Sequence, residues 1–249
     1  MNVLIVGYGV VGNNLSKEIE KLNPDIYDKY KNVDTRTRKK YDIAFICVDT
    51  PISEGQLCDT KQVVNAIEEN EADYYVIKST VLPHTTEQLI ERTGKNIIFS
   101  PEYYGATQHC NNFEFDFTIL GGEKNACRKV VQILQNVYDG RHSFRIVDST
   151  TAELAKYMEN SWIATKVSFC VQFYQLAKKL DVSYEELREL FILDPRVNPS
   201  HTFVYETHPY WHSHCLDKDV TAIAKSENAE LLLDVIRFNE KSKLDCGDS

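Results

Sequence analysis

The stretch NVLIVGYGVVGNNL (residues 2–15) decides the expected fold. Its first five residues are a short apolar run rich in β-branched side chains, which is typical of a strand buried in a parallel sheet. Gly7, Gly9 and Gly12 follow with the spacing G-x-G-x-x-G, and the residues after them have helical spacing. Such glycines permit a tight turn, a close approach of the backbone to a pyrophosphate, and close packing of helix against strand. The stretch therefore predicts a strand-turn-helix unit whose helix N-terminus attracts phosphate.

Asp28 narrows the choice of nucleotide for this turn. It closes a second expected strand, 24–28, and lies sixteen residues after Gly12. A carboxylate at this place accepts hydrogen bonds from ribose hydroxyls and disfavours a 2′-phosphate, so we expect NAD rather than NADP. Within the turn, we expect Tyr8, Val10 and Val11 to contact the cofactor together with the three glycines. The alternative is a strand-helix turn that binds no nucleotide.

Strand and helix patterns alternate up to about residue 149. Further strands are expected at 41–48, 73–80, 95–101, 115–122 and 143–149, and helices at 10–22, 61–70, 84–94 and 123–138. This alternation predicts an α/β protein with a Rossmann-like, doubly wound parallel sheet and right-handed crossovers. The segment between Asp28 and Tyr41 is too short for the strand and helix of a standard dinucleotide fold, so we expect a sheet reduced on this side.

The pattern changes from Thr151 onward. One long helix is expected over 149–181, and shorter helices over 183–193, from near Cys215, and over 227–243. We therefore expect two domains. Residues 1–149 would form the NAD-binding domain, and residues 150–249 an all-α central domain that carries dimerisation.

Composition and charge limit the possible partners. The net charge is −9, which argues against nucleic acid, because phosphate binding requires clustered lysine and arginine. No apolar run approaches the ~18 residues that cross a bilayer, so no membrane partner is expected. The seven cysteines follow no scaffold spacing, and the N-terminus has no basic leader, so reduced thiols and a cytoplasmic location are expected. His208, His212, His214 and Cys215 lack a second ligand pair at a typical spacing, so no metal site is expected.

Two residue pairs have the spacing of one helical turn. Lys156 and Asn160 share one face of the long helix, where a cation and an amide would stabilise an oxyanion. Cys215 and Asp219 share a face if a helix begins near Cys215, and a thiol at a helix N-terminus is expected to have a lowered pKa and nucleophilic character. The alternatives are a solvated helix face for the first pair and a packed cysteine for the second.

Several motifs together resemble the UDP-glucose/GDP-mannose dehydrogenase family, in family order over residues 2 to about 240. The matching stretches are GYGVVG (7–12), VDTP (48–51), KSTVLPHTT (78–86), SPEYY (100–104), AELAKYMENSWIATKVSF (152–169) and CLDKDV (215–220). The resemblance implies a four-electron enzyme that oxidises the C6 alcohol of a nucleotide sugar to a carboxylate with two NAD.

The resemblance also implies catalytic roles. Cys215 matches the nucleophile, which forms a thiohemiacetal and then a thioester, and Lys156 and Asn160 match the groups that stabilise each oxyanion. Asp219 matches the residue that positions or activates water, and Glu102 the carboxylate used in thioester hydrolysis. The chemistry agrees with these residue types, because two oxidations at one carbon require the aldehyde to be held between the steps.

Further positions are implied to bind water, substrate or cofactor. These are Thr80 for water, Val48 and Thr50 for the cofactor, Lys218 for both substrate and cofactor, and Tyr103, Tyr104 and Arg196 for the substrate, together with Glu102, Lys156 and Asn160. Arg196 resembles an arginine that reaches the sugar in the neighbouring subunit. The long helix is implied to form the core of a homodimer.

The sequence departs from the family pattern in three places. A third domain that grips the nucleotide end of the substrate would begin where this sequence ends, so we expect that domain to be lacking. The glycine-rich loop before the cysteine is replaced by HPYWHSHC (208–215), and His84 replaces a glycine. These departures keep open the alternative of a non-catalytic NAD-binding or partner-dependent protein. A two-electron hydroxyacid dehydrogenase would share the fold and the Lys156 and Asn160 pair, but it does not explain Cys215, Lys218 and Asp219.

Overall fold

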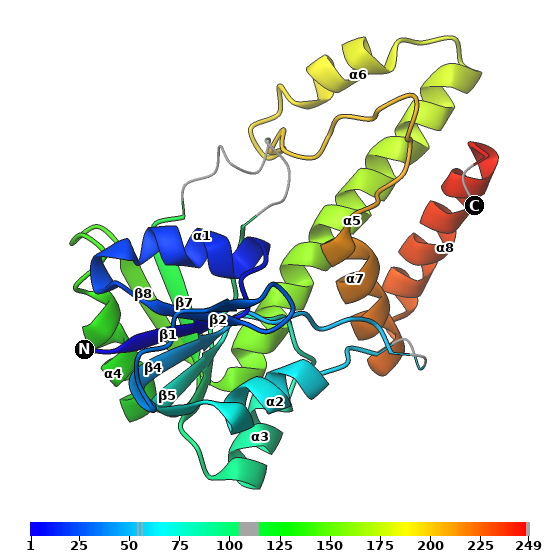
Figure 1. Cartoon of the computed structure of the whole chain (residues 1–249). Helices are drawn as coiled ribbons and strands as arrows, with labels where there is room; N and C mark the ends of the chain where they lie inside the picture. Colours follow the sequence, from blue (N-terminus) through cyan, green and yellow to red (C-terminus); the bar gives the residue numbers. More distant parts are fainter. Residues whose placement is uncertain (54, 56, 105–114, 248–249) are drawn as a thin grey trace. The chain divides into compact units, whose positions relative to one another are not determined.

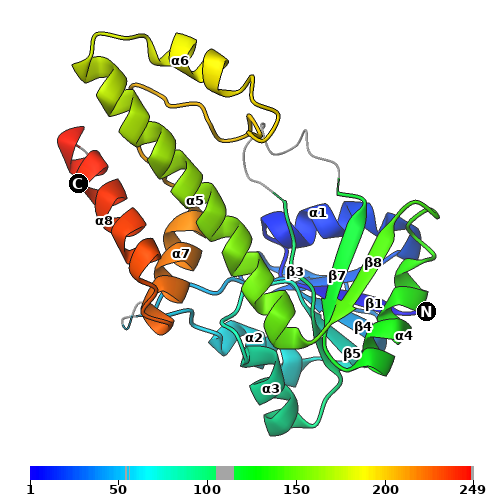
Figure 2. The ribbon, with the colours of Figure 1, turned by 180° about the vertical axis from the view of Figure 1, so that it is seen from behind.

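A computed structural model describes residues 1–53, 55, 57–104 and 115–247. Contacts between residues divide the chain into two compact units (Figures 1 and 2). Unit 1 comprises Met1–Pro51 and Cys58–Lys156, and unit 2 comprises Ile52–Leu57 and Tyr157–Ser249. This division falls inside the long helix, and the boundary expected at residue 149 stays a prediction.

Unit 1 contains an eight-stranded sheet of order β3-β2-β1-β4-β5-β6-β7-β8. The pairs β1–β2, β1–β4, β4–β5, β5–β6 and β7–β8 are parallel, whereas β2–β3 and β6–β7 are antiparallel. The α/β fold class is therefore confirmed, with the addition that the sheet is mixed. The strands are β1 Val3–Val6, β2 Asp25–Asp28, β3 Val33–Asp34, β4 Lys40–Ile46, β5 Glu71–Ile77, β6 Ile97–Phe99, β7 Phe117–Gly121 and β8 Ser143–Val147.

Helices cover both faces of the sheet because alternate residues of each strand point to opposite sides. On one face, Val3 and Ile5 of β1 belong to a core cluster that includes α1 Val10–Glu18 and α4 Lys124–Leu134. On the other face, Leu4 and Val6 belong to a cluster that includes α2 Lys61–Glu69 and α3 Thr85–Thr93. In Figure 1, α1 lies above the strands, and α2 and α3 lie below them. A short 3-10 helix, η1 Glu20–Leu22, follows α1.

The reduced side of the sheet is a β-hairpin. β2 and β3 pair antiparallel, with Asp28 opposite Val33, and residues 29–32 form the turn between them. Asn32 has φ 53°, a left-handed conformation that asparagine tolerates better than most residues. A doubly wound fold has a crossover helix at this point. The short segment instead reverses the chain at once, because only an antiparallel pair can be joined by a tight turn.

Unit 2 is helical. Its elements are the part of α5 Ser149–Lys179 that follows Lys156, and α6 Tyr184–Phe191, α7 His214–Ser226 and α8 Glu230–Asp245. Its core contains Ala164, Trp211, Val220 and Val235. Ser213 caps α7, since its hydroxyl accepts a hydrogen bond from the Leu216 N–H. In the described part of the chain, every helix is too short or too polar to span a bilayer.

Candidate active site and nucleotide pocket

The glycine-rich turn has the geometry that its sequence predicts. Gly7 has φ 92°, and a Cβ added there would lie 2.5 Å from the carbonyl oxygen of Cys47. A Cβ at Gly12 would lie 2.0 Å from the carbonyl oxygen of Gly7, so neither position admits another residue without displacement of the backbone. At Gly9, by contrast, an added Cβ would meet nothing within 4 Å. The turn thus leaves open space at Gly9, where the backbone of a dinucleotide site meets the pyrophosphate.

A cavity of about 400 Å³ in unit 1 extends from this turn to the ends of β2 and β4. Gly7, Gly9 and Val48 line it, as does Asp28. The Asp28 carboxylate accepts a hydrogen bond from the Tyr8 N–H at 2.7 Å. The cavity and these residues therefore fit the NAD that the motif predicts, with the pyrophosphate at the N-terminus of α1 and the ribose at Asp28. Val10 is exposed and Val11 half-buried at the start of α1.

The carboxyl ends of β4 and β5 bring Thr50 and Thr80 together. The Thr50 hydroxyl donates to the Thr80 carbonyl at 2.9 Å, and the Cys58 thiol donates to the same carbonyl at 3.3 Å. In open α/β sheets, ligands bind outside the carboxyl ends of the strands. Both predicted residues are thus on the edge of the sheet where a ligand is expected.

Glu102 follows β6 at the same edge and is buried. Its carboxylate accepts a hydrogen bond from the Tyr104 N–H at 2.8 Å. The Lys78 ammonium donates to the Ser100 hydroxyl and the Pro101 carbonyl, both at 3.3 Å, and so fixes the segment that precedes Glu102. Burial lowers the pKa of Lys78, and Glu102 and Lys156 are among the charges that act on it.

Lys78 is a residue of this neighbourhood to which the motifs gave no role. The signal was present in the KST motif, where a lysine directly follows a buried strand.

The Lys156 ammonium lies 4.9 Å from the ring centroid of Tyr103, a cation–π distance. Unit 1 therefore gathers Lys78, Glu102, Tyr103 and Lys156 in one electrostatic neighbourhood.

In unit 2, the predicted residues Asn160 and Asp219 are hydrogen-bonded. The Asn160 side-chain amide of α5 donates to the Asp219 carboxylate of α7 at 2.6 Å, and the Lys218 ammonium donates to the other carboxylate oxygen. Asn160 is 5% exposed and Asp219 is 1% exposed. A buried carboxylate is stable when it is paired and hydrogen-bonded. The three residues therefore form a preassembled cluster within the helical unit.

Cys215 is the second residue of α7 and is exposed. It lies one helical turn before Asp219, as the sequence predicted, because α7 begins at His214. Cys47 provides a contrast, since it is buried behind the nucleotide turn and burial raises its pKa to about 12. Of these two thiols, only Cys215 is accessible to a substrate.

The loop before Cys215 is anchored by side chains that none of the sequence motifs indicated. The Asn239 side chain of α8 accepts a hydrogen bond from the Trp211 N–H and donates to the Trp211 carbonyl, each at 2.9 Å. The Trp211 indole N–H donates to the Ser168 hydroxyl of α5 at 2.9 Å. Because these partners lie far apart in sequence, no local pattern indicates them.

His212, Ser213 and Lys243 converge on Asp217. The His212 ring lies 2.8 Å from the Asp217 carboxylate, which also accepts a hydrogen bond from the Ser213 N–H at 2.8 Å and lies 3.3 Å from the Lys243 ammonium. His212 thus pairs with a carboxylate. Among the residues that the structure describes, histidine, cysteine and acidic side chains form no group of three that could hold a metal ion.

The predicted residue Arg196 and the altered residue His84 belong to neither of the clusters described above. Arg196 is exposed and pairs with Asp194 at 2.6 Å on the surface of unit 2. His84 has φ 71°, a left-handed conformation that favours glycine. Its ring contacts Glu87 and the Thr150 hydroxyl, each at 3.1 Å.

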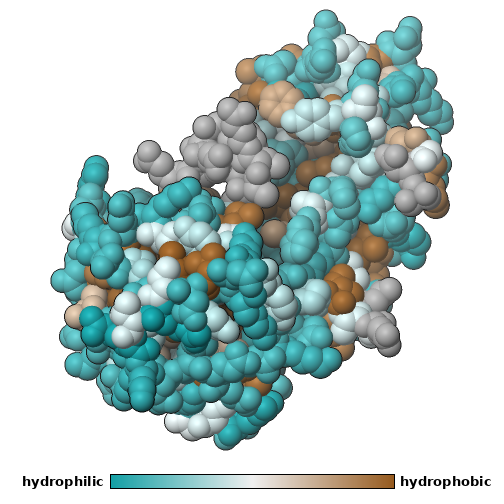
Figure 3. All heavy atoms as spheres, in the orientation of Figure 1, coloured by the Kyte–Doolittle hydropathy of each residue, from teal (hydrophilic) through white to brown (hydrophobic). Residues whose placement is uncertain are grey.

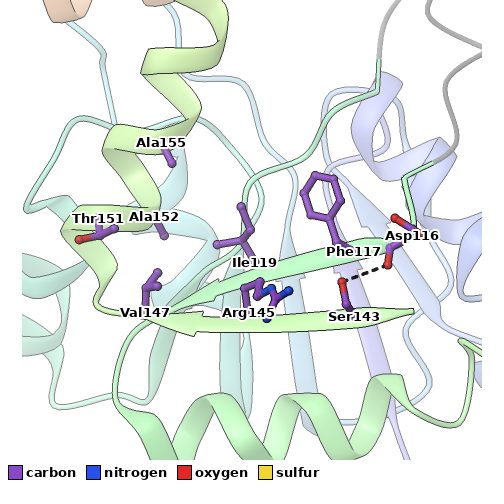
Figure 4. A pocket seen from close by; sticks show the side chains of 9 residues that line it. All are labelled: Asp116, Phe117, Ile119, Ser143, Arg145, Val147, Thr151, Ala152 and Ala155. Atoms are coloured by element: carbon purple, nitrogen blue, oxygen red, sulfur yellow. Dashed lines mark hydrogen bonds between the residues drawn. The ribbon is translucent and has the colours of Figure 1, made fainter. Parts of the chain in front are cut away.

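A second cavity, of about 380 Å³, contains none of the predicted site residues. It lies within unit 1 between β7, β8 and the first turns of α5, as Figure 4 shows. Val147, Ala152 and Ala155 lie at one end, Ile119 and Arg145 lie in the middle, and Phe117, Ser143 and Asp116 lie at the other end.

The fold and the glycine-rich turn define a dinucleotide-binding protein of the Rossmann-like class. Two sequence models of one family match the chain: the NAD binding domain of the UDP-glucose/GDP-mannose dehydrogenase family over residues 19–141, and the central domain of the same family over residues 150–241. The chain belongs to this family of NAD-dependent nucleotide-sugar dehydrogenases, and its cofactor is NAD.

Relatives with curated names agree on the family but differ in substrate. A UDP-N-acetyl-D-mannosamine dehydrogenase of Methanococcus aeolicus is 30% identical over 215 residues, which cover 80% of this chain and 48% of the relative. A UDP-glucose 6-dehydrogenase of Rickettsia felis is 27% identical over 209 residues, which cover 78% of this chain and 46% of the relative. The chain thus spans about half the length of these relatives.

Solved structures confirm the fold. A UDP-glucose dehydrogenase from Pyrobaculum islandicum superposes with a TM-score of 0.79 at 21% identity, covering 96% of this chain and 68% of that one. A UDP-N-acetyl-mannosamine dehydrogenase from Staphylococcus aureus superposes with a TM-score of 0.74 at 20% identity. The superposition covers 98% of this chain and 68% of that one.

Proposed function

We propose that this chain oxidises the C6 alcohol of a nucleotide sugar to the carboxylate, with UDP-glucose to UDP-glucuronate as the first candidate reaction. The observation that carries the proposal is the buried Asn160–Asp219–Lys218 cluster, which lies one helical turn from the exposed thiol of Cys215. A structural ion pair alone gives no reason for an accessible cysteine at the adjacent helix N-terminus. The set matches the residue types that covalent oxidation of an aldehyde requires.

The cofactor is held, in this proposal, by the turn at Gly7–Gly12 and by Asp28. NAD supplies the hydride acceptor for each of the two oxidations. The open space at Gly9 accommodates the pyrophosphate, and the Asp28 carboxylate accepts hydrogen bonds from the ribose.

Cys215 carries the covalent chemistry. The first oxidation removes a hydride and the hydroxyl proton from the C6 alcohol and leaves an aldehyde. The Cys215 thiolate adds to the aldehyde carbon, and protonation of the oxyanion gives a thiohemiacetal. Loss of a second hydride and of the hydroxyl proton gives a thioester. Lys156 and Asn160 stabilise the negative oxygen in each step, as a cation and an amide do in an oxyanion hole.

Hydrolysis releases the product. Water attacks the thioester carbonyl, the carbon–sulfur bond breaks, and the products are the sugar carboxylate and the free Cys215 thiol. Asp219 and Glu102 are the carboxylates that position the water and accept its proton, and Thr80 binds the water. Lys218, already bonded to Asp219, orients that carboxylate.

A homodimer through α5 is the second part of the proposal. Exposed apolar side chains share one face of α5, namely Met158, Trp162, Phe169, Phe173 and Leu176. Leu180, directly after the helix, is exposed as well. Figure 3 shows hydrophobic side chains reaching the surface of the helical unit. A long exposed apolar stripe is typical of a protein interface. Arg196 would then serve the sugar site of the neighbouring subunit.

Counting NADH tests the proposed reaction. Purified protein is incubated with excess NAD and a limiting amount of UDP-glucose, UDP-N-acetylmannosamine or GDP-mannose, and NADH absorbance is divided by the sugar consumed. Two NADH per sugar support the four-electron route and identify the substrate. One NADH per sugar would instead indicate the two-electron alternative. Binding of NAD without any NADH would favour a non-catalytic or partner-dependent protein.

The proposed location is the cytoplasm. A mechanism with a free thiol suits this reducing compartment.

A further inference from the structure

Lys78 occupies a central place at the edge of the sheet where the strands of unit 1 end. β4, β5 and β6 are parallel neighbours, and their ladder continues one residue past the strands. The Lys78 N–H donates to the Ile46 carbonyl at 2.8 Å, and the Ser100 N–H donates to the Ile77 carbonyl at 2.9 Å. The register therefore places Lys78 between Cys47 and Ser100, at the edge where ligands bind in open α/β sheets.

The Lys78 side chain is buried without a direct ion pair. It is 8% exposed, although lysine is almost never buried unless its charge is paired. Its ammonium donates to the Ser100 hydroxyl and the Pro101 carbonyl, each at 3.3 Å. Among the residues that the structure describes, no carboxylate is bonded to this ammonium. Two long hydrogen bonds to neutral oxygens offset only part of the cost of burying the charge.

Carboxylates act on Lys78 through space. Burial lowers the pKa of Lys78, whereas Glu18 of α1 and Glu102 after β6 raise it. Lys156 lowers it further. Cys47 lies among the same groups, because burial raises the pKa of its thiol to about 12, Lys78 lowers that pKa and Glu102 raises it. The thiol is uncharged at neutral pH, so the two carboxylates stabilise the ammonium, and the ammonium stabilises them in return.

We infer that Lys78 is a positioning residue for Glu102, which fixes the segment that leads to Glu102 and keeps its carboxylate ionised at neutral pH. This role rests on the proposed function of Glu102 in thioester hydrolysis. Pro101, to which Lys78 is bonded, directly precedes Glu102, and Glu102 is 9% exposed. Burial favours the neutral form of a carboxyl group, and a nearby ammonium opposes that effect. Only the ionised form can accept a proton from the attacking water.

NMR titration of the full chain with isotopically labelled glutamate carboxyl groups measures the ionisation of Glu102 without turnover. The signal that is lost in Glu102→Gln identifies this residue. In Lys78→Met, the ionisation midpoint of Glu102 should rise by at least about half a pH unit, because the positive charge is removed. Lys78→Gln should give the same rise and serves if the methionine variant does not fold. Ser100→Ala removes one hydrogen bond but keeps the charge, so it should leave the midpoint nearly unchanged.

Lys95→Met is the matched control for the loss of a lysine in unit 1. Lys95 is half-buried and precedes β6, whereas Glu102 follows that strand, so the two lie toward opposite edges of the sheet. Its ammonium donates to the Ile67 carbonyl at 2.6 Å and to the Tyr75 hydroxyl at 2.9 Å. This control should leave the midpoint of Glu102 unchanged. Circular dichroism checks that the variants keep their secondary structure.

Turnover reports the consequence for the reaction. With an active nucleotide sugar, the acidic limb of the kcat profile should move to higher pH in Lys78→Met by the same amount as the midpoint, with KM little changed. An unaltered midpoint in Lys78→Met, an equal shift in Lys95→Met, or an unmoved kcat limb would overturn the inference. A raised midpoint in a chain that oxidises no nucleotide sugar would support the coupling of Lys78 to Glu102 and contradict only the proposed function.

Discussion

Cys215 and Cys246 are both exposed, and they lie at opposite ends of their helices. Cys215 is in the first turn of α7, and Cys246 follows the last residue of α8. A helix N-terminus favours a nearby negative charge, and a C-terminus disfavours one. The thiolate is the reactive form of cysteine. The position of each residue within its helix therefore predicts which thiol reacts.

We expect iodoacetamide to alkylate Cys215 at least several-fold faster than Cys246 at pH 7, as measured by peptide mass spectrometry. Cys215→Ser should abolish turnover with the active nucleotide sugar, because no thioester forms, and Cys246→Ser should retain it. NAD binding by both variants should match that of the unaltered chain. Full activity in Cys215→Ser would show that the covalent route is wrong.

Glu153 predicts a pH-dependent contribution to stability. One carboxylate oxygen accepts hydrogen bonds from the Thr86 N–H and hydroxyl at 2.8 and 2.6 Å. The other oxygen is buried and has no hydrogen-bond partner among the residues that the structure describes. Burial raises the pKa of Glu153 above 4.5. The unfolded chain thus releases this proton more readily than the folded chain. The stability that this group contributes below pH 4.5 is lost as the pH rises through the folded-state pKa.

Glu153→Gln should remove the loss of stability that Glu153 causes as the pH rises, because glutamine does not ionise. We expect the free energy of unfolding of the variant, relative to the unaltered chain, to rise as the pH increases from about 4.5. Urea unfolding at a series of pH values measures the difference. Glu91→Gln, at an exposed position on α3, controls for the loss of one negative charge. A difference for Glu153→Gln that is constant over the whole pH range would contradict the assignment.

At the scale of elements, the loop before α7 owes its conformation to α8 and α5. Asn239 is 1% exposed, and both its side-chain oxygen and nitrogen bond the backbone of Trp211. Removing the side chain leaves a buried N–H and a buried carbonyl without these partners. Each unsatisfied buried group costs about 1–3 kcal/mol. The anchor therefore determines where Ser213 caps α7 and where Cys215 lies.

Asn239→Ala should lower the free energy of unfolding by about 2–4 kcal/mol, measured by urea denaturation. Asn136→Ala is the control, because Asn136 is exposed and its amide bonds only carbonyls of its own helical turn. We expect the control to cost less than about 1 kcal/mol. A comparable loss in both variants would show that the contacts with Trp211 contribute little.

At the scale of the whole molecule, the apolar stripe on α5 predicts self-association. Trp162 is 62% exposed and Met158 is 75% exposed, one turn apart on the same face. Large exposed side chains on one helix face gain stability when a second copy removes them from water. Because the exposed apolar side chains continue along α5 to Leu176, we expect the interface to follow the part of the helix that belongs to unit 2.

Trp162→Glu should shift the chain from dimer to monomer in sedimentation-velocity experiments, because a charge would be buried at the centre of the interface. Lys178→Glu changes an exposed residue on the opposite face of α5 and should leave the dimer intact. Circular dichroism checks that both variants keep their helical content. A monomer in the unaltered chain at micromolar concentration would contradict the prediction.

The helices and strands followed from the sequence where local physics decides them. The apolar run 2–6 and the glycines after it predicted β1 and α1, because a buried strand and a tight turn have few compatible residue types. The spacing of Cys215 and Asp219 predicted one face of α7, because the helical period is fixed. The roles of these residues stay predictions.

Only the tertiary structure decided the partners of these residues. The Asn160–Asp219 hydrogen bond joins positions 59 residues apart, and Asn239 reaches Trp211 across 28 residues. The antiparallel β2–β3 hairpin that turns Lys29 and Lys31 toward the nucleotide cavity also appeared only in the fold. Sequence alone determined most of the strands and helices, because local patterns reflect backbone geometry and burial, but it did not indicate the short strand β3. Their pairing depended on how those elements pack, which no local pattern records.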